Sequence, residues 1–432
     1  KAALGEALKS SGRGLIGSSR YRLHRFVVSA QVALTLVLLV GAGLLIRSFA
    51  NLLDADTGFD AQNLLTVRIA PPLAPPRPDQ TMETYIEHYF AEREKTAVFY
   101  RDLISRIDSL PGVRATGAIN RLPMRGSWWQ LDLEIEGSPT PDPDDKLVAF
   151  GRVVTPGYFA AMRIPLLNGR FFEEADGPST RRVAVINSAM SQRYFSGTDP
   201  LGRRIRLTGE PDEWGSATII GVVGDVRHAG LASEAEPMIY VPLSQAAFGF
   251  FGDWGMTMVI RTEINPMSLV AAVRREALSL DAALPIYEIA AMDQVIGETI
   301  AERRFNMLVL ASFAILALAL AAAGLYGVMS YQTNNRTREI GIRMALGAER
   351  SDILKMVLKE GIAVAAAGVT AGLVGAFALT RAMTSLLYGV SATNPAIFFG
   401  LAIMLLAVAA VACYIPARRA TKIDPMIALR CE

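Results

Sequence analysis

The sequence predicts an α-helical membrane protein with four transmembrane helices and an α+β extracytoplasmic domain. Three observations predict this class. Four long apolar runs contain no charged side chain, lysines and arginines gather beside alternate ends of these runs, and more than half of the chain lies between the first run and the second. The chain has 432 residues, of which 51% are hydrophobic, as is typical of a membrane protein.

Each uncharged run is long enough to cross the hydrocarbon core of a bilayer, which takes about 20 residues of helix. The runs occupy residues 26–46, 307–329, 361–380 and 396–416. A buried helix of a large soluble core is the alternative for any one run, but four together favour a membrane. None of the runs contains Asp, Glu, Lys, Arg or His, so an ion or proton pathway through the membrane is disfavoured.

The distribution of positive charge predicts the orientation. Sixteen lysines and arginines lie before the first run, between the second and third, and after the fourth. The opposite ends of the runs are flanked only by Arg47, Arg303, Arg304 and Arg381. Because positive residues stay on the cytoplasmic side, both termini and the loop 332–360 are predicted to be cytoplasmic.

The third run contains a step of small residues, Gly368-Val-Thr-Ala-Gly372. Glycines at this spacing let two membrane helices approach closely. We therefore predict a helix contact at Gly368 and Gly372, the alternative being an ordinary run rich in Ala and Gly.

The segment between the first two runs predicts two βαβ units around an insertion. A strand at 63–69 and another at 256–262 are each followed by a helical pattern and a further strand. Asn265-Pro266 is typical of a helix N-cap and first helical residue. Within 126–240, short β-branched runs such as RVAVINSAM are divided by Gly, Pro and Asp, which predicts a mostly β insertion.

The sequence offers no convincing catalytic or metal site. It lacks Gly-x-Ser-x-Gly, HExxH and Walker A motifs. Its two cysteines are Cys413, in an apolar run, and Cys431, beside the C-terminus, so they predict no disulfide framework. The three histidines are far apart and have no nearby cysteine. We therefore predict a chain that is not an enzyme and holds no metal.

The loop after the second run has the pattern of a short amphipathic helix. In RTREIGIRMALGA (336–348), apolar residues alternate with charged ones until Gly347-Ala348, and Ser351-Asp352 can cap the next helix. Such a helix lies in the lipid interface or docks in a groove of a soluble partner. Glu339 and the closing Gly-Ala favour docking.

This loop resembles the cytoplasmic signature of MacB/FtsX-type ABC transporter permeases. The tail PARRATKIDPMIALR resembles the end of the same family, and TPGYFAAMRIPLLNGRFF with RVAVINSAM and RYFSGTDPLGRRI resembles its extracytoplasmic domain. The resemblance covers nearly the whole chain. The family's arrangement of one span, a large periplasmic domain and three further spans agrees with the arrangement that the charges predict.

The resemblance implies that the loop is a coupling element seated on a separate ABC ATP-binding subunit. The residues that match the motif and would face that ATPase are Arg338, Glu339, Gly341, Arg343, Leu346, Gly347 and Ala348. It also implies that ATP and Mg²⁺ are bound by the partner ATPase and that this chain holds no cofactor. ATP-driven dimerisation would move the periplasmic domains through the spans, without substrate passing through the membrane.

The resemblance further implies how the chain is divided in the bacterial inner membrane. The expected parts are a cytoplasmic segment 1–25, transmembrane helix 26–48, periplasmic domain 49–305 (porter-like 60–125 and 241–300, sabre-like insertion 126–240), transmembrane helix 306–331, cytoplasmic coupling loop 332–360, transmembrane helix 361–380, periplasmic loop 381–395, transmembrane helix 396–416 and cytoplasmic tail 417–432. A second permease unit is expected as partner, in a homodimer or as the other half of a tandem chain. LGEALKSSGRG resembles the joint of tandem members, which would explain a chain that starts at Lys1 and not at Met.

The predicted function is a non-catalytic permease subunit that couples ATP hydrolysis to efflux or extraction of a peptide, drug or lipoprotein. A periplasmic adaptor is a further candidate partner, membrane lipid surrounds the spans, and no nucleic acid is expected. The alternatives are a membrane receptor, which would need a larger cytoplasmic output domain, and a membrane-anchored regulator of a periplasmic enzyme.

Overall fold

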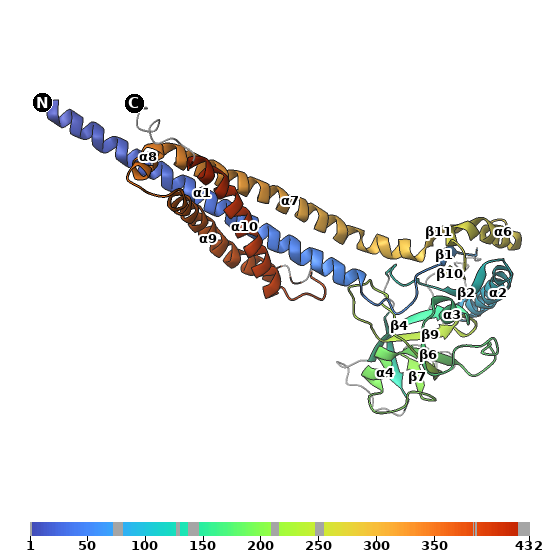
Figure 1. The fold of residues 1–432 in the computed structure, drawn as a ribbon. Coiled ribbons are helices and arrows are strands. Elements are labelled where there is room, and N and C mark those ends of the chain that lie inside the picture. Colours follow the sequence, from blue (N-terminus) through green and yellow to red (C-terminus); the bar gives the residue numbers. More distant parts are fainter. Residues whose placement is uncertain are drawn as a thin grey trace. The chain divides into compact units, whose positions relative to one another are not determined.

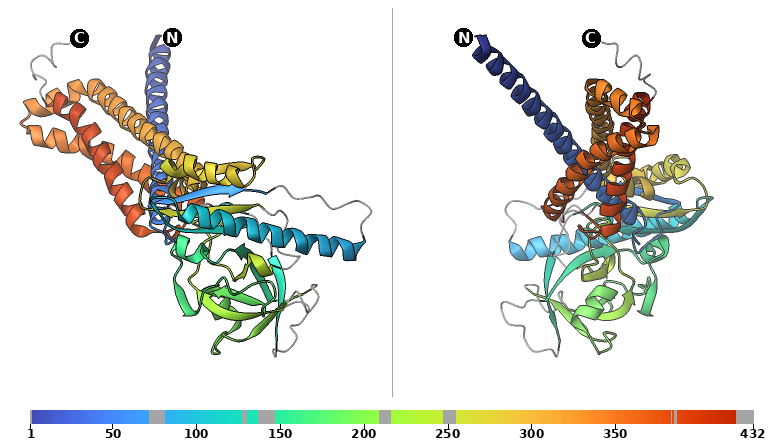
Figure 2. Two further views of the ribbon diagram at one scale, coloured as in Figure 1. Left: turned by 90° about the vertical axis from the view of Figure 1, so that its right-hand side faces the viewer. Right: turned by 60° about the vertical axis from the view of Figure 1, so that its left-hand side comes forward.

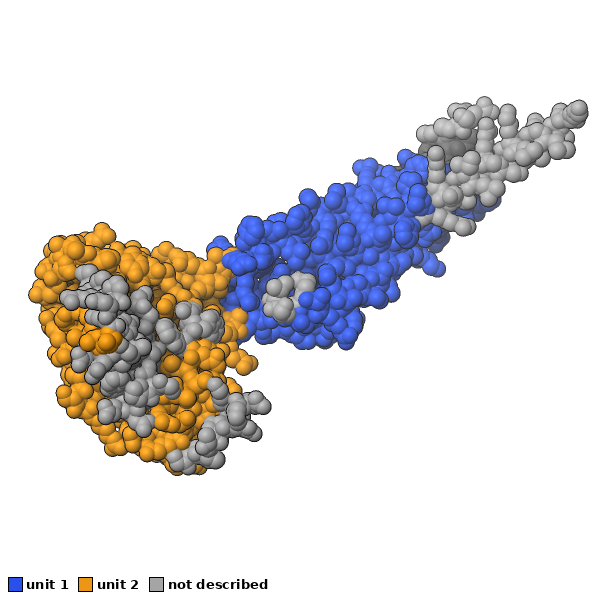
Figure 3. Space-filling model, turned by 180° about the vertical axis from the view of Figure 1, so that it is seen from behind, with its two compact units in different colours: residues 1–54, 302–432 blue, residues 55–301 orange. Residues whose placement is uncertain are grey.

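The computed structural model describes residues 2–71, 81–126, 130–136, 147–208, 216–246, 255–382, 384 and 387–421. The chain divides into two compact units (Figures 1 and 3). Unit 1 comprises Lys1–Asp54 and Glu302–Glu432, and unit 2 comprises Ala55–Ala301. This division separates the four apolar runs from most of the long segment between the first two.

Unit 2 contains the two predicted βαβ units. Their elements are β1 (Leu64–Ile69), α2 (Met82–Asp108) and β2 (Val113–Ile119), then β10 (Met256–Thr262), α6 (Val270–Leu280) and β11 (Ile286–Ala291). The four strands lie in the order β11-β1-β10-β2, and each strand is antiparallel to its neighbours. Strands far apart in the sequence, such as β1 and β10, therefore lie side by side (Figure 2). The split α/β subdomain is therefore confirmed, and β10 has the bounds of the predicted strand 256–262.

Local capping explains where the helices of these units begin. The hydroxyl of Thr81 accepts a hydrogen bond from the Thr84 amide, so α2 starts well before VFYRDLISRIDSL (98–110), the helical pattern that follows the first predicted strand. Asn265 caps as predicted, since its side chain accepts from the Met267 amide. The first turn after it, Pro266–Leu269, is a 3₁₀ helix that leads into α6.

The insertion is mostly β, as predicted, and joins the same sheet. Its elements are β3 (Gln130–Ile135), β4 (Leu147–Val154), α3 (Tyr158–Met162), β5 (Leu166–Gly169), β6 (Val183–Asn187), α4 (Ser188–Tyr194), β7 (Arg204–Leu207), β8 (Ser216–Val223) and β9 (Met238–Pro242). The run RVAVINSAM is strand only as far as Asn187, because the Asn187 side chain caps α4. β9 crosses the expected boundary at 240/241 and pairs with β4 and β6, so the insertion extends to Pro242.

A cluster of polar side chains is buried in unit 2. His228 Nε2 lies 3.3 Å from the Tyr240 hydroxyl, and the Arg152 side chain is 5% exposed. Arg152 Nε, the Tyr158 hydroxyl and His228 Nδ1 have no hydrogen-bond partner in the part of the chain that the structure describes. Burial lowers the pKa of His228 well below its usual value, and the positive charge of Arg152 lowers it further. His228 is therefore neutral in the folded unit at neutral pH.

We predict that His228 makes unit 2 less stable in mild acid. Below about pH 6.5 the unfolded chain protonates this histidine while the folded chain does not, so stability falls by at most about 1.4 kcal/mol per pH unit. His228→Gln removes this contribution and should flatten the fall between pH 7 and pH 5. All four tryptophans lie within the sequence of unit 2, so melting followed by tryptophan fluorescence reports on this unit. His88→Gln is the control, and equal pH slopes for wild type and His228→Gln would contradict the prediction.

Among the described residues, four helices are long and apolar enough to cross a membrane, and they lie in unit 1 except for the first turns of α7, which belong to unit 2. They are α1 (Ala2–Leu53), of which Leu23–Leu53 is the candidate span, α7 (Met292–Asn335), α9 (Arg350–Ala382) and α10 (Pro395–Ala420). The four predicted runs fall inside these helices. Their buried core is formed largely by Val, Leu and Ala side chains, as the uncharged sequences predict.

Glycines bring α9 close to α1. A Cβ atom added at Gly368 would lie 2.6 Å from the Ser29 carbonyl oxygen, and one added at Gly372 would lie 2.8 Å from the Ala33 carbonyl oxygen. The Ser29 hydroxyl donates a hydrogen bond to the carbonyl oxygen of Val364, at 3.0 Å. The structure therefore places both glycines of the small-residue step against the backbone of α1.

We predict that Gly368→Ala destabilises the helices of unit 1 by about 1–3 kcal/mol, because α1 and α9 must move apart to admit the methyl group. Gly400→Ala in α10 is the matched control, since nothing lies within 4 Å of its added Cβ. The measurement is loss of helical circular dichroism during titration of the purified chain with sodium dodecyl sulfate. Equal midpoints for the two variants would contradict the prediction.

Candidate functional site

The predicted coupling loop is a structured elbow in unit 1. α8 (Thr337–Ala345) lies between the end of α7 and the start of α9 (Figure 1). Its C-terminal turn is closed by two hydrogen bonds, from the Gly347 amide to the Met344 carbonyl at 3.1 Å and from the Ala348 amide to the Arg343 carbonyl at 3.0 Å. This pair defines a Schellman motif, and Gly347 takes the left-handed conformation that the motif requires, with φ +97°.

The helix that follows is capped from its own sequence. The Glu349 amide donates to Asp352 Oδ2 at 3.2 Å, so Asp352 closes the first turn of α9. Asp352 therefore takes part in the cap, as predicted, but the helix begins at Arg350, one residue before Ser351. The elbow is therefore fixed at both of its turns by hydrogen bonds to backbone amides.

α8 divides its apolar residues between two faces. Ile340 is 1% exposed and, with Met344, packs against Ile353 and Ala420. Ile342 is 43% exposed and Leu346 is 83% exposed. The spacing of four residues within each pair explains the division, because such residues lie on one side of a helix. One apolar pair therefore anchors α8 and the other faces outward.

Charged side chains border the outward pair. Arg343 forms an ion pair with Glu339 at 2.6 Å, and both side chains are about half exposed. The Arg343 guanidinium also donates to the sulfur of Met356 at 2.7 Å, which ties it to α9. We call Glu339, Ile342, Arg343 and Leu346 the outer face of α8.

The structure separates the predicted coupling residues by role. Glu339, Arg343 and Leu346 lie on the outer face. Gly341 is buried, and Gly347 and Ala348 form the closing turn. The side chain of Arg338 lies outside the part that the structure describes, as do residues 422–430 of the tail motif.

Ile342 was missing from the predicted set. The signal that finds it is the spacing of four residues to Leu346, which the alternation of apolar and charged residues along the sequence conceals. In the described residues, no group of three or more His, Cys, Asp or Glu side chains is placed to hold a metal ion. The elbow offers instead an exposed apolar pair, Ile342 and Leu346, bordered by the ion pair of Glu339 and Arg343.

Comparison with known protein families gives two matches. The model of the MacB-like periplasmic core domain matches residues 29–280, and that of the FtsX-like permease C-terminal domain matches residues 311–425. The first alone covers more than half of the chain. The chain therefore belongs to the family of MacB/FtsX-type permeases.

Among curated proteins, the chain is 32% identical over 278 residues to the pyoverdine export ATP-binding/permease protein PvdT of Pseudomonas savastanoi pv. phaseolicola. It is 29% identical over 277 residues to the macrolide export ATP-binding/permease protein MacB of Marinobacter nauticus. The matches cover 62% and 63% of this chain. The chain spans about two-fifths of the length of these relatives, at 40% and 42%.

Among solved structures, the periplasmic region of MacB from Actinobacillus actinomycetemcomitans matches 58% of this chain and 98% of its own, with 13% identity and a TM-score of 0.34. The extracellular domain of the transporter YknZ from Gram-positive bacteria matches 43% of this chain and 87% of its own, with 18% identity and a TM-score of 0.30.

We predict that Gly347→Ala loosens the elbow. A side chain in the left-handed conformation costs about 1–2 kcal/mol, and no neighbour within 4 Å obstructs the new methyl group, so the effect is one of backbone strain. Hydrogen exchange should become faster at the two amides of the closing turn, those of positions 347 and 348. Gly327→Ala in α7 is the control, because its added Cβ also meets nothing within 4 Å and its backbone is helical. Unchanged exchange in Gly347→Ala would show that the turn does not depend on glycine.

Proposed function

We propose that this chain is a non-catalytic permease subunit of an ABC exporter and that the outer face of α8 docks on a separate ATP-binding subunit. The observation that carries the proposal is the exposed pair Ile342 and Leu346 beside the Arg343–Glu339 ion pair. Two large apolar side chains exposed together, Ile342 at 43% and Leu346 at 83%, support a contact with a partner. ATP and Mg²⁺ are bound by that partner.

The charge pattern supports the orientation that this docking needs. The loop that contains α8 has Arg336, Arg343 and Arg350 close to the membrane, and Arg418 and Arg419 lie in the last turn of α10. Positive residues at these ends favour the cytoplasmic side. Both termini and α8 then lie in the cytoplasm, and unit 2 lies in the periplasm of a bacterium, with the spans in its inner membrane.

The helices support a mechanical form of coupling. The spans lack the ionisable side chains, Asp, Glu, Lys, Arg and His, that usually line a pathway for ions or protons. In the most apolar stretch of α7, 17% of the residues are buried, compared with 50% in α1. Much of the apolar surface of α7 is therefore available to lipid or to a second permease unit. We propose a complex with two such units, in which ATP-driven movement of the ATPases is transmitted to unit 2 and does its work there.

The relatives support export as the work that is done. Two of them are named for the export of pyoverdine and of macrolides. We propose that this chain serves the efflux of a peptide or drug-like molecule, with or without a periplasmic adaptor. Extraction of a lipoprotein and control of a periplasmic enzyme would use the same coupling to the ATPase.

We predict that Arg343→Glu weakens ATPase docking by a few kcal/mol if the contact excludes water. Purification of the tagged chain in detergent from its native membrane should retain an ATP-binding protein with wild type and at least tenfold less with Arg343→Glu or Leu346→Glu. Membrane insertion should be unchanged. Arg350→Glu is the matched control, since Arg350 is exposed in the same loop but lies outside the outer face.

A charge exchange separates docking from helix stability. The double variant Glu339→Arg with Arg343→Glu keeps an ion pair at the same spacing. If the outer face contacts the ATPase, the double variant also fails to retain it. Recovery of binding in the double variant would mean that the pair only stabilises α8. Absence of an ATPase from every preparation would contradict the proposed function and favour a receptor or a regulator.

A further inference from the structure

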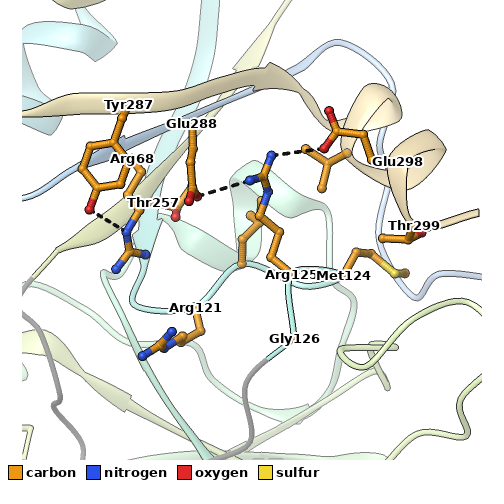
Figure 4. Close-up of a pocket in the computed structure, with 12 residues that line it drawn as sticks. Arg68, Arg121, Met124, Arg125, Gly126, Thr257, Tyr287, Glu288, Glu298 and Thr299 are labelled. Atoms are coloured by element: carbon orange, nitrogen blue, oxygen red, sulfur yellow. Dashed lines mark hydrogen bonds and ion pairs between the residues drawn. The ribbon is translucent and has the colours of Figure 1, made fainter. Parts of the chain in front are cut away.

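A pocket of about 650 Å³ lies within unit 2, apart from the elbow. It is formed by β1, by the connection after β2, by β10 and β11, and by the first turns of α7 (Figure 4). The residues that line it are Arg68, Arg121, Leu122, Met124, Arg125, Gly126, Thr257, Tyr287, Glu288, Val295, Glu298 and Thr299. A volume of this order holds a small organic molecule.

The lining of the pocket is positively charged. It has three arginines and two glutamates, and both glutamates are engaged by Arg125, at 3.4 Å from Glu288 and 3.5 Å from Glu298 (Figure 4). Arg121 is half-buried and makes no hydrogen bond or ion pair with the described residues. Its positive charge is therefore available to an anion that enters the pocket.

Two further arginines reinforce the positive potential. Arg68 is 8% exposed and is held by the Tyr287 hydroxyl, 3.1 Å from its Nε, and by the Asn120 carbonyl, 3.2 Å from its Nη1. These bonds fix its guanidinium at the pocket wall. Arg152 is close enough to Arg121 for their charges to repel: burial lowers the pKa of Arg152, and the positive charge of Arg121 adds to this lowering. An anion beside Arg121 would relieve this repulsion.

The backbone is strained where it forms the pocket. Met124 and Glu288 have positive φ, at +70° and +51°, and are two of the four described non-glycine residues in that conformation. Each costs free energy that the surrounding fold must offset, and such residues gather at ligand sites. The Met124 amide donates to the His228 carbonyl at 3.0 Å, which holds the turn that presents Arg121 and Arg125.

Tyr287 supplies the main apolar surface that a ligand in the pocket could meet. Its side chain is 40% exposed, whereas those of Leu122, Met124 and Val295 are buried, at 4%, 4% and 1% exposed. We propose that this pocket binds a small organic anion, with its carboxylate or phosphate group beside Arg121 and Arg68 and its apolar or aromatic body against Tyr287. The site goes beyond the proposed coupling and is independent of the ATPase.

The test uses the purified full chain in detergent, without any ATPase, and three probes: phenyl phosphate, inorganic phosphate and benzyl alcohol. Isothermal titration calorimetry should show saturable binding of phenyl phosphate, weaker binding of inorganic phosphate and none of benzyl alcohol. Phenyl phosphate should also raise the melting temperature of unit 2, followed by tryptophan fluorescence. Stronger binding of benzyl alcohol than of phenyl phosphate would overturn the proposal.

Variants locate the site. Arg121→Gln should weaken phenyl phosphate binding at least tenfold, and Thr299→Phe should weaken it by filling the pocket while every charge is kept. Arg203→Gln, at an exposed arginine elsewhere in unit 2, is the control and should bind as wild type does. Equal binding by all three variants, or no binding of phenyl phosphate to wild type, would overturn the proposal. Neither result would affect the retention of an ATPase at α8.

Discussion

The close contact between α9 and α1 is the interaction on which unit 1 depends. Lipid and leucine are equally apolar, so membrane helices gain little from burying leucine against each other and associate mainly where their surfaces fit closely. Gly368 and Gly372 remove side chains at the points where the α1 backbone approaches. Once α9 is held there, its N-terminal turns present Ile353 to α8, and the position of the elbow follows.

The fold could be predicted from the sequence to the extent that its signals are local. The uncharged runs, the strand 256–262 and the cap at Asn265 each depend on neighbouring residues, and each was confirmed. The beginning of α2 and the end of β6 were missed. Both are set by single capping side chains, Thr81 and Asn187, inside segments whose composition is ambiguous.

The candidate sites were less accessible to prediction. A resemblance to a family marks every residue of a motif equally, whereas the structure assigns Gly347 to the turn and Leu346 to the surface. The pocket of unit 2 gave no sequence signal at all. Arg68, Arg121 and Glu288 come from three distant segments that only the order of the strands brings together.

The closing turn of α8 has a consequence for how the signature of this loop is read among related sequences. The turn combines a glycine that the backbone geometry requires with exposed residues that the proposed ATPase contact would require. The glycine would persist in any chain that folds this elbow, whether or not it still meets an ATPase. The exposed residues would be free to change once the partner was lost. A relative that keeps the glycine but has polar residues in place of Ile342 and Leu346 would therefore be a permease that has lost its ATPase partner. Its sequence alone would reveal this loss.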